Sequence, residues 1–327
     1  MSKRASIALS ALILLTPLVV APLLAQTPAR ALKTVTRGTV STTAVEWPDI
    51  VANKKGFYEK EGLKVEHAII SPTTITPSLI GGTIQFGFIN ASSMVLATKA
   101  GADLVAIGQG ADPSPYSLVT GKSIKTLADL KGKTLSLSEP GDAYAEATKE
   151  ILRKAGLNPD TDLNIRYGGN SNQRMAALVA GAVDAVPLVP PQDKLLVDQG
   201  YNAVAFYPDY YPKLTLSTTA VSRAWAKNNA DTVKAFMRAQ AAAIVWLYDP
   251  ANKDEALKLL IDETKADLSA AQQSYDVYLT KLHIFPINGC VQPAGFEALI
   301  NVLSKVNKAV QPGEAASQFM DTQYCPN

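Results

Sequence analysis

The sequence predicts an α/β protein of two similar lobes, each built on a parallel sheet covered by helices, with a ligand cleft between them. Three observations carry this prediction. Predicted strands and helices alternate from residue 33 to residue 207, which is typical of parallel sheets. One phrase occurs twice, as "LIGGTIQFGFINA" at 79–91 and "LVAGAVDAVPLVP" at 178–190. Two extended segments, 116–123 and 213–222, can carry the chain from one lobe to the other and back.

The first half of the chain supplies the elements of one lobe. Strands are predicted where β-branched and apolar residues run between turn residues. Helices are predicted where apolar residues recur at helical spacing and a glycine follows. On these grounds the strands of this half are 33–40, 63–70, 84–90 and 104–110, and the helical segments between them are 41–62, 74–82 and 91–101.

The second half repeats this order and then changes character. Its predicted strands are 133–138, 163–169, 182–190 and 201–207, and its helices are 126–132, 142–156, 171–181 and 191–200. Residues 223–282 show helical periodicity without strands, and one more helix begins after Pro293. The two copies of the phrase therefore fall at equivalent places, where a helix ends at Gly82 or Gly181 and the chain enters the sheet.

These elements divide into two lobes that share a cleft. If both extended segments cross, lobe one is 32–118 plus 219–327 and lobe two is 119–218, with 1–31 set aside as a signal peptide. Ligands of open α/β sheets bind outside the carboxyl ends of the strands. Two such ends, facing one another across two hinge crossings, form a cleft that closes on its ligand.

The N-terminus is typical of an exported protein. A basic pair at 3–4 precedes an uncharged run at 5–25, and small residues at 29–31 suit signal peptidase. Cleavage after Ala25 is an alternative to cleavage after Ala31. The run is long enough for a permanent membrane anchor, but two prolines interrupt it. We therefore expect export, cleavage and a soluble mature protein.

The composition excludes some classes of partner. The 327 residues are 47% hydrophobic, which suffices for one large or two medium domains. The 31 basic and 29 acidic residues leave a net charge of +2 without any block of like charge, so a nucleic-acid partner is not expected.

The two cysteines are predicted to form a disulfide. Thiols of an exported protein meet an oxidising compartment, so Cys290 and Cys325 should pair, although two buried free thiols are an alternative. A zinc site is not expected, because His67 and His283 have no ligand spacing with them.

The motifs in the sequence that resemble catalytic or cofactor-binding motifs are incomplete. The "GKS" at 121–123 has Tyr116 where a phosphate loop needs glycine, and "GQGADP" at 108–113 ends in proline where a dinucleotide site needs glycine. No convincing nucleophile–base pair is present. We expect no catalytic residues, no metal and no cofactor.

The candidate ligand-binding residues lie in loops after the predicted strands. Backbone N–H groups at helix starts hold anionic or polar groups there. Hydroxyl residues in these loops could instead only cap helices, and the tryptophan could belong to the core. The candidates of lobe one are Ser41, Thr42, Thr43, Trp47, Asn90, Ala91 and Ser92. The candidates of lobe two are Gly141, Asp142, Ala143, Tyr144, Asn170, Ser171, Pro190 and Gln192.

Three charged side chains near these loops have two interpretations each. Glu139 and Asp142 could pair with a cationic ligand, or could only stabilise the start of a helix. Arg174 could reach an anion, or could only solvate its helix.

The chain resembles the periplasmic solute-binding proteins of ABC importers, in the nitrate/sulfonate/taurine branch that includes thiamine-pyrimidine-precursor proteins. The resemblance covers nearly all of the predicted mature chain and implies the two-lobed periplasmic-binding-protein fold, type II-like. The residues that carry it are 51–66, 79–88, 124–143, 152–163, 175–191 and 249–257.

The resemblance also implies a function. We expect a monomeric receptor in the periplasm that captures a small organic solute and delivers it to a permease driven by a cytoplasmic ATPase. The hydroxyl-rich loops favour an anion such as a sulfonate or a carboxylate. One alternative is an enzyme of the pyrimidine-precursor-synthase type that uses the same cleft. The cysteine-rich motif of the yeast-type synthases is absent, which favours binding. Another alternative is a ligand-sensing subunit for a receptor kinase.

Overall fold

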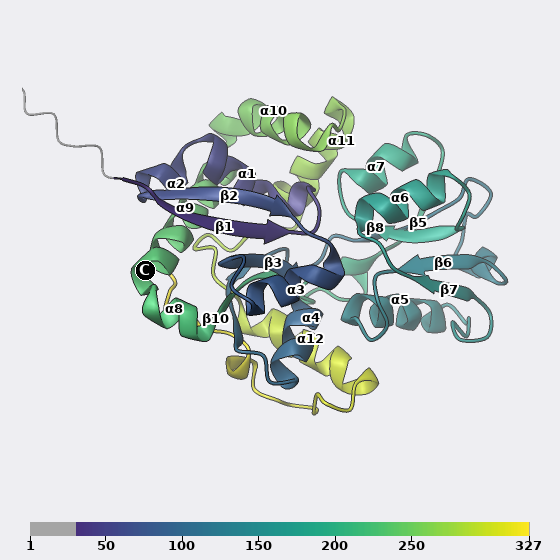
Figure 1. The fold of residues 1–327 in the computed structure, drawn as a ribbon. Helices are drawn as coiled ribbons and strands as arrows, with labels where there is room; N and C mark the ends of the chain where they lie inside the picture. Colours follow the sequence, from purple (N-terminus) through teal and green to yellow (C-terminus); the bar gives the residue numbers. More distant parts are fainter. Residues whose placement is uncertain (1–30, 327) are drawn as a thin grey trace, which may run out of the picture. The chain divides into compact units, whose positions relative to one another are not determined.

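The computed structural model describes residues 31–326 and contains two five-stranded sheets (Figure 1). The first sheet has the strand order β2-β1-β3-β10-β4, and the second has the order β7-β6-β8-β5-β9. The strands are β1 Lys33–Thr39, β2 Leu63–Ile69, β3 Phe86–Asn90, β4 Leu104–Gln109, β5 Ser117–Thr120, β6 Thr134–Leu137, β7 Asn164–Tyr167, β8 Ala185–Leu188, β9 Asn202–Phe206 and β10 Ser217–Ser222. The two orders are equivalent, with β5 and β10 inserted at the same position.

The inserted strands make both sheets mixed, which corrects the prediction of parallel sheets. β10 runs antiparallel to β3 and β4, and β5 runs antiparallel to β8 and β9. The chain enters each inserted strand directly from the other sheet. The inserted strand therefore runs in the opposite direction to its neighbours, which helices of their own sheet connect. The predicted divisions after residues 118 and 218 both fall inside an inserted strand, and the exact extent of the lobes stays a proposal.

Helices cover both sheets, and the segment after β10 is helical without strands, as predicted. The α-helices are α1 Trp47–Lys54, α2 Phe57–Lys60, α3 Pro72–Ile80, α4 Ala91–Lys99, α5 Ala143–Lys154, α6 Ser171–Val179, α7 Gln192–Val197, α8 Arg223–Asn228, α9 Ala230–Tyr248, α10 Lys253–Thr264, α11 Leu268–Tyr275 and α12 Pro293–Val306. The short helices are η1 Ala44–Glu46, η2 Ala128–Leu130, η3 Tyr207–Asp209, η4 Pro250–Asn252, η5 Asp276–Lys281 and η6 Ala316–Gln318.

No helix within residues 31–326 is both long and apolar enough to cross a membrane. The predicted signal peptide at 1–31 lies, apart from its last residue, outside the described part of the chain.

The repeated phrase builds the same unit in both sheets. Leu79 and Leu178 are buried at the ends of α3 and α6, and the glycines that follow have φ angles of 76° at Gly82 and 70° at Gly181. Residues other than glycine rarely adopt this left-handed backbone conformation. The chain then enters β3 or β8, so the two copies occupy the equivalent places that the sequence predicts.

The last part of the chain packs on the first sheet. α9 lies against α1 and α2, and α12 lies against α4 and also against α5 of the second sheet (Figure 1). Cys290 and Met320 form isolated bridges with β4. The structure joins Cys290 to Cys325 in a disulfide, as predicted, and this ties the C-terminal residues to the edge of the sheet.

Replacing both cysteines by serine will lower the free energy of unfolding by about 3–4 kcal/mol, because the disulfide restricts the unfolded chain. The two cysteines are 35 residues apart, so the loop that they close is long. Urea denaturation of the variant and of the oxidised wild type measures the difference. Reduced wild type is the control and should match the variant. Equal midpoints for the variant and the oxidised wild type would contradict the prediction.

Candidate functional site

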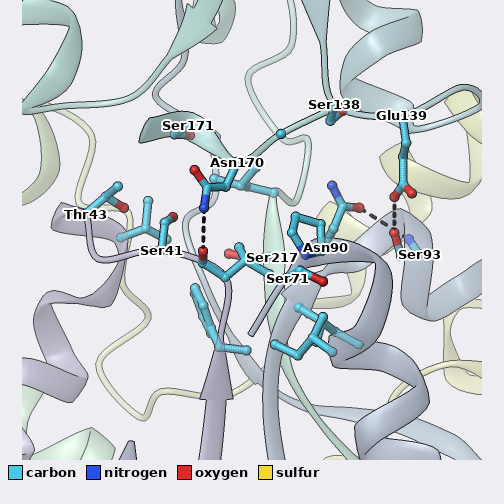
Figure 2. A pocket seen from close by; sticks show the side chains of 18 of the residues that line it. Ser41, Thr43, Ser71, Asn90, Ser93, Ser138, Glu139, Asn170, Ser171 and Ser217 are labelled. Carbon is cyan, nitrogen blue, oxygen red and sulfur yellow. Dashed lines mark hydrogen bonds between the residues drawn. The ribbon is translucent and has the colours of Figure 1, made fainter. Parts of the chain in front are cut away.

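A cavity of about 350 Å³ lies at the carboxyl ends of strands from both sheets (Figure 2). Its lining comes from the loops after β1, β3, β6, β7 and β8, from the starts of α3 and α6, and from β10. Apolar side chains include Val40, Phe88, Val189 and Leu216. The polar residues labelled in Figure 2 are Ser41, Thr43, Ser71, Asn90, Ser93, Ser138, Glu139, Asn170, Ser171 and Ser217.

Five of the candidate residues line this cavity, namely Ser41, Thr43, Asn90, Asn170 and Ser171. They come from three segments that lie far apart in the sequence. Thr42 lies instead at a separate cavity of about 250 Å³, beside α1 and β2. The other candidates lie elsewhere.

Trp47 belongs to the core, so the prediction that it lines the cleft is wrong. Its side chain is 0% exposed, and its indole N–H donates to the Ala256 carbonyl of α10 at 3.2 Å. The ring also makes an edge contact with Tyr275, with 6.2 Å between ring centroids. Trp47 is the first residue of α1, and it lies on the face of that helix that packs against α10 and α11. These two helices come later in the sequence than all the strands, so no local pattern around Trp47 indicates their presence.

The candidates at the start of α5 do not line the cavity either. Gly141 and Asp142 precede α5, Asp142 caps the helix, and Ala143 is buried in the first turn. The Asp142 carboxylate accepts from the Tyr144 backbone N–H at 3.3 Å. The Tyr144 hydroxyl donates to the Leu214 carbonyl at 2.7 Å, which joins α5 to the segment before β10.

Ala91 and Ser92 are buried in the first turn of α4. The Ser92 hydroxyl accepts from the Ala143 backbone N–H at 3.0 Å. Ser92 therefore connects the first sheet to α5 rather than facing the cavity.

Pro190 and Gln192 form a packed turn before α7. Gln192 is buried and donates to the Asn172 side chain at 2.5 Å. The Pro190 carbonyl accepts from the Tyr278 hydroxyl at 3.5 Å. These contacts direct the turn towards protein rather than into the cavity.

Sequence reasoning missed several lining residues, and one had a signal. Ser71 is the residue before α3, and Asn170 is the residue before α6. The two helices are equivalent in the repeat, so the selection of Asn170 implies Ser71. Ser217 lies in a crossing segment, and Phe88 has no local pattern that separates it from core residues.

Hydrogen bonds connect the two sides of the cavity. The Asn170 amide donates to the Val40 carbonyl at 3.2 Å, and the Ser93 hydroxyl donates to Glu139 at 2.5 Å (Figure 2). The Asn90 amide donates to Asp142 at 3.2 Å. Residues after β1 and β3 are thereby held against residues after β6 and β7, which is a closed arrangement of the two sheets.

Arg174 brings a buried guanidinium to the cavity. The residue is 5% exposed, and it donates to the Gly169 carbonyl at 2.8 Å and to the Ser171 hydroxyl at 3.3 Å. Its Nε has no hydrogen-bond partner within residues 31–326, and no carboxylate in that range forms a salt bridge with it. The Ser217 hydroxyl is likewise buried without a partner in the described chain. Both residues line the cavity.

A second buried arginine lies beneath the cavity. Arg37 of β1 forms salt bridges with Glu46 at 2.6 Å and with Asp49 at 3.2 Å. Its guanidinium also lies 4.9 Å from the centroid of the Phe88 ring, which lines the cavity. Glu46 lines the cavity as well. The side of the cavity formed by Phe88 and Glu46, which we call its floor, therefore packs against this cluster.

The cluster shifts the pKa values of its carboxyl groups in opposite directions. Burial raises the pKa of Glu46 above its ordinary value, although Arg37 opposes the shift. Burial also acts to raise the pKa of Asp49, but Arg37 and His67 outweigh burial and hold that pKa at about 2. His67 contacts Asp49 at 2.8 Å, so this histidine is part of the cluster.

Replacing Trp47 with alanine will lower the free energy of unfolding by about 3–5 kcal/mol, because the change leaves a cavity in the core. Urea denaturation measures the loss. The control is Val245→Ala on α9, where the side chain is 54% exposed and the change should cost less than about 0.5 kcal/mol. A Trp47→Ala protein as stable as the control would show that Trp47 is not a core residue.

The chain matches the model of the family described as NMT1/THI5 like over residues 45–253, which is more than half of its length. It is 23% identical over 266 residues to YtlA of Bacillus subtilis strain 168, and the match covers 79% of both chains. A 4-amino-5-hydroxymethyl-2-methylpyrimidine phosphate synthase of Schizosaccharomyces pombe is 30% identical over 149 residues, which covers 43% of this chain and 40% of the synthase.

Solved structures establish the fold. The alkanesulfonate-binding protein SsuA of Xanthomonas axonopodis pv. citri, bound to MOPS, superposes with a TM-score of 0.71 at 20% identity and covers 88% of this chain and 98% of its own. A Candida albicans gene product with the generic periplasmic binding protein fold superposes with a TM-score of 0.68 at 13% identity, covering 90% and 98%. The chain has the periplasmic-binding-protein fold, and it belongs to the NMT1/THI5-like family.

Proposed function

We propose that this protein is an extracytoplasmic solute-binding receptor that captures a small organic acid between its two sheets and delivers it to an ABC permease. The observation that carries the proposal is the buried Arg174, whose Nε has no partner in the described chain and which lines the cavity. The alkanesulfonate-binding protein with the same fold supports the choice of an acid. Export directed by the predicted signal peptide, which is then removed, would bring the receptor to the periplasm.

The guanidinium favours an oxyanion for a physical reason. A buried donor without a partner costs about 1–3 kcal/mol, and more when it is charged. A carboxylate or sulfonate accepts two parallel hydrogen bonds from an arginine and also neutralises its charge. Ser217, Ser171 and Asn170 lie in the same cavity and can donate further hydrogen bonds to the acid.

Capture and closure are coupled in this arrangement. A solute in the cavity contacts loops from both sheets, so it binds more tightly when the sheets are closed on each other. The Asn170–Val40 and Ser93–Glu139 hydrogen bonds join loops of the two sheets, so they stabilise the closed arrangement. A permease that recognises the closed state would then receive only the loaded receptor.

An enzyme remains the second candidate because of the pyrimidine phosphate synthase among the relatives. Within residues 31–326, the lining of the cavity contains no histidine, cysteine or lysine. Histidine is the side chain that most often acts as a general base, and cysteine and lysine are common nucleophiles. The lining therefore favours binding, and chemical change of a bound solute over hours would favour the enzyme.

Replacing Arg174 with glutamine will weaken the binding of an acid by about 30-fold or more, because the paired guanidinium is lost. A panel of sulfonates and carboxylates is first screened by thermal unfolding, since a ligand at a hundred times its Kd adds about 2.7 kcal/mol of stability. Titration calorimetry of each hit then compares the variant with wild type.

The matched control is Arg166→Gln, which removes an exposed arginine of β7 on the same sheet and should leave the Kd unchanged. If no acid stabilises the wild type, or if both variants bind alike, Arg174 does not hold an acid and the proposal fails.

A further inference from the structure

We propose that closing of the cavity takes up a proton at Asp112, so that this receptor closes on its solute more readily as the pH falls. The inference rests on the proposed function, because it concerns the closing of the same two sheets around the same cavity. It follows from the position of one carboxylate among the segments that move when the sheets open.

Asp112 lies in the hinge between the two sheets. Two hinge segments join the sheets, one at 110–116 between β4 and β5 and the other at 207–216 between β9 and β10. The Asp112 side chain, in the first segment, faces the Thr215 hydroxyl of the second. Hinge closure concentrates its backbone changes in such connecting segments. Asp112 therefore lies where the movement takes place.

Helices from both sheets cover this carboxylate. Gly295, in the first turn of α12, lies so close that a Cβ atom there would overlap an Asp112 carboxylate oxygen and the Thr215 hydroxyl. On the other side, the Tyr144 hydroxyl of α5 donates to the Leu214 carbonyl at 2.7 Å, and the charge of Asp112 acts on this tyrosine. α12 also packs directly against α5 (Figure 1). The cover over Asp112 is thus made by two helices that belong to different sheets.

The charge of Asp112 has little compensation. Lys213, in the second hinge segment, is the one cation within residues 31–326 that acts on it, and this residue is exposed. Thr215 contributes a neutral hydroxyl, and Tyr144 is the titratable group of α5 that faces it. No charged side chain of the described part of α12 acts on it. Burial therefore outweighs Lys213 and raises the pKa of Asp112 to about 6.

Opening of the cavity removes this burial. The second sheet turns about the hinge segments and carries α5 away from α12, so water reaches the Asp112 carboxylate. A hydrated aspartate has a pKa of about 3.9. The closed state therefore binds the proton more tightly than the open state, and its advantage is lost as the pH rises through about 6. Between pH 7 and pH 5 the ratio of closed to open molecules should rise about tenfold.

A second buried carboxylate lies outside the hinge. Burial also raises the pKa of Asp193 to about 6. Its side chain accepts from the Ser117 hydroxyl at 2.8 Å. α7 carries Asp193 and packs against β5, which carries Ser117, so both residues move with the second sheet. Opening leaves this contact in place, and Asp193 should contribute little to the pH response.

The test measures the separation of the two sheets without any solute. Lys131→Cys and Lys258→Cys place spin labels at two exposed positions, one before β6 and the other on α10. Pulsed electron paramagnetic resonance then gives the populations of open and closed molecules. With Asp112 present, we expect the ratio of closed to open molecules to rise about tenfold from pH 7 to pH 5. Asp112→Asn is always neutral, so it should have the high ratio already at pH 7 and change little on acidification.

A second variant tests the same carboxylate from its partner. Lys213 holds the pKa of Asp112 down, so Lys213→Gln should move the midpoint of the transition to a higher pH. The matched control is Asp209→Asn, which removes an exposed aspartate of the second hinge segment and should keep the response of the parent protein. Thermal unfolding establishes that each variant is folded.

The inference is overturned if the ratio does not change between pH 7 and pH 5, or if Asp112→Asn responds to pH as its parent does. The proposed function stands in either case, because capture of an acid at Arg174 does not require a proton at the hinge. Failure of every acid to bind, with the pH response intact, would remove the proposed function and leave the proton-linked hinge in place.

Discussion

The charge of Arg37 is the constraint around which the floor of the cavity is arranged. The side chain extends from β1 and is only 2% exposed, so its charge must be paired within the protein. Glu46 and Asp49 supply the two carboxylates, and they lie on consecutive short elements, η1 and α1. Breaking such a buried pair costs about 3–5 kcal/mol, so the path of the chain after β1 is tied to this arginine.

This cluster also connects the cavity to the rest of the first sheet. Asp49 accepts from the Tyr58 hydroxyl at 2.5 Å and from the Gln240 amide at 3.3 Å, which brings in α2 and α9. The Phe88 ring lies over the guanidinium on the cavity side. A change in the floor therefore also alters contacts of α2 and α9, which are far apart in the sequence. A floor held by these contacts limits the orientations that a bound solute can adopt.

Much of the fold was predictable from the sequence because it rests on local patterns. The repeat, the glycine stops and the alternation of strands and helices are all properties of short segments, and the strands lie close to where they were predicted. The antiparallel direction of β5 and β10 was not predictable in this way. It depends on which sheet each crossing segment joins, and therefore on contacts between distant residues.

The site was less predictable than the fold, for a related reason. Ser41, Asn90 and Asn170, which were selected for their position at strand ends, line the cavity, since the carboxyl ends of the strands meet there. The direction of each side chain depends on packing that no local pattern contains. Trp47 and Tyr144 point into protein, whereas Arg174, on a helix whose exposed positions are otherwise uncharged, lines the cavity.

The position of β10 governs the order in which the protein can be completed as it emerges from the ribosome or from a membrane channel. All strands of the second sheet lie between residues 117 and 206, so that sheet is available as one continuous stretch. The first sheet begins earlier in the chain but finishes later, because β4 pairs with β10 and forms its further bridges with Met320 and Cys290. Until Ser217–Ser222 emerge, β4 has no neighbour in its own sheet. A nascent chain must therefore hold β4 unpaired while the later sheet assembles, which makes the earlier half of this protein the part most in need of protection from aggregation.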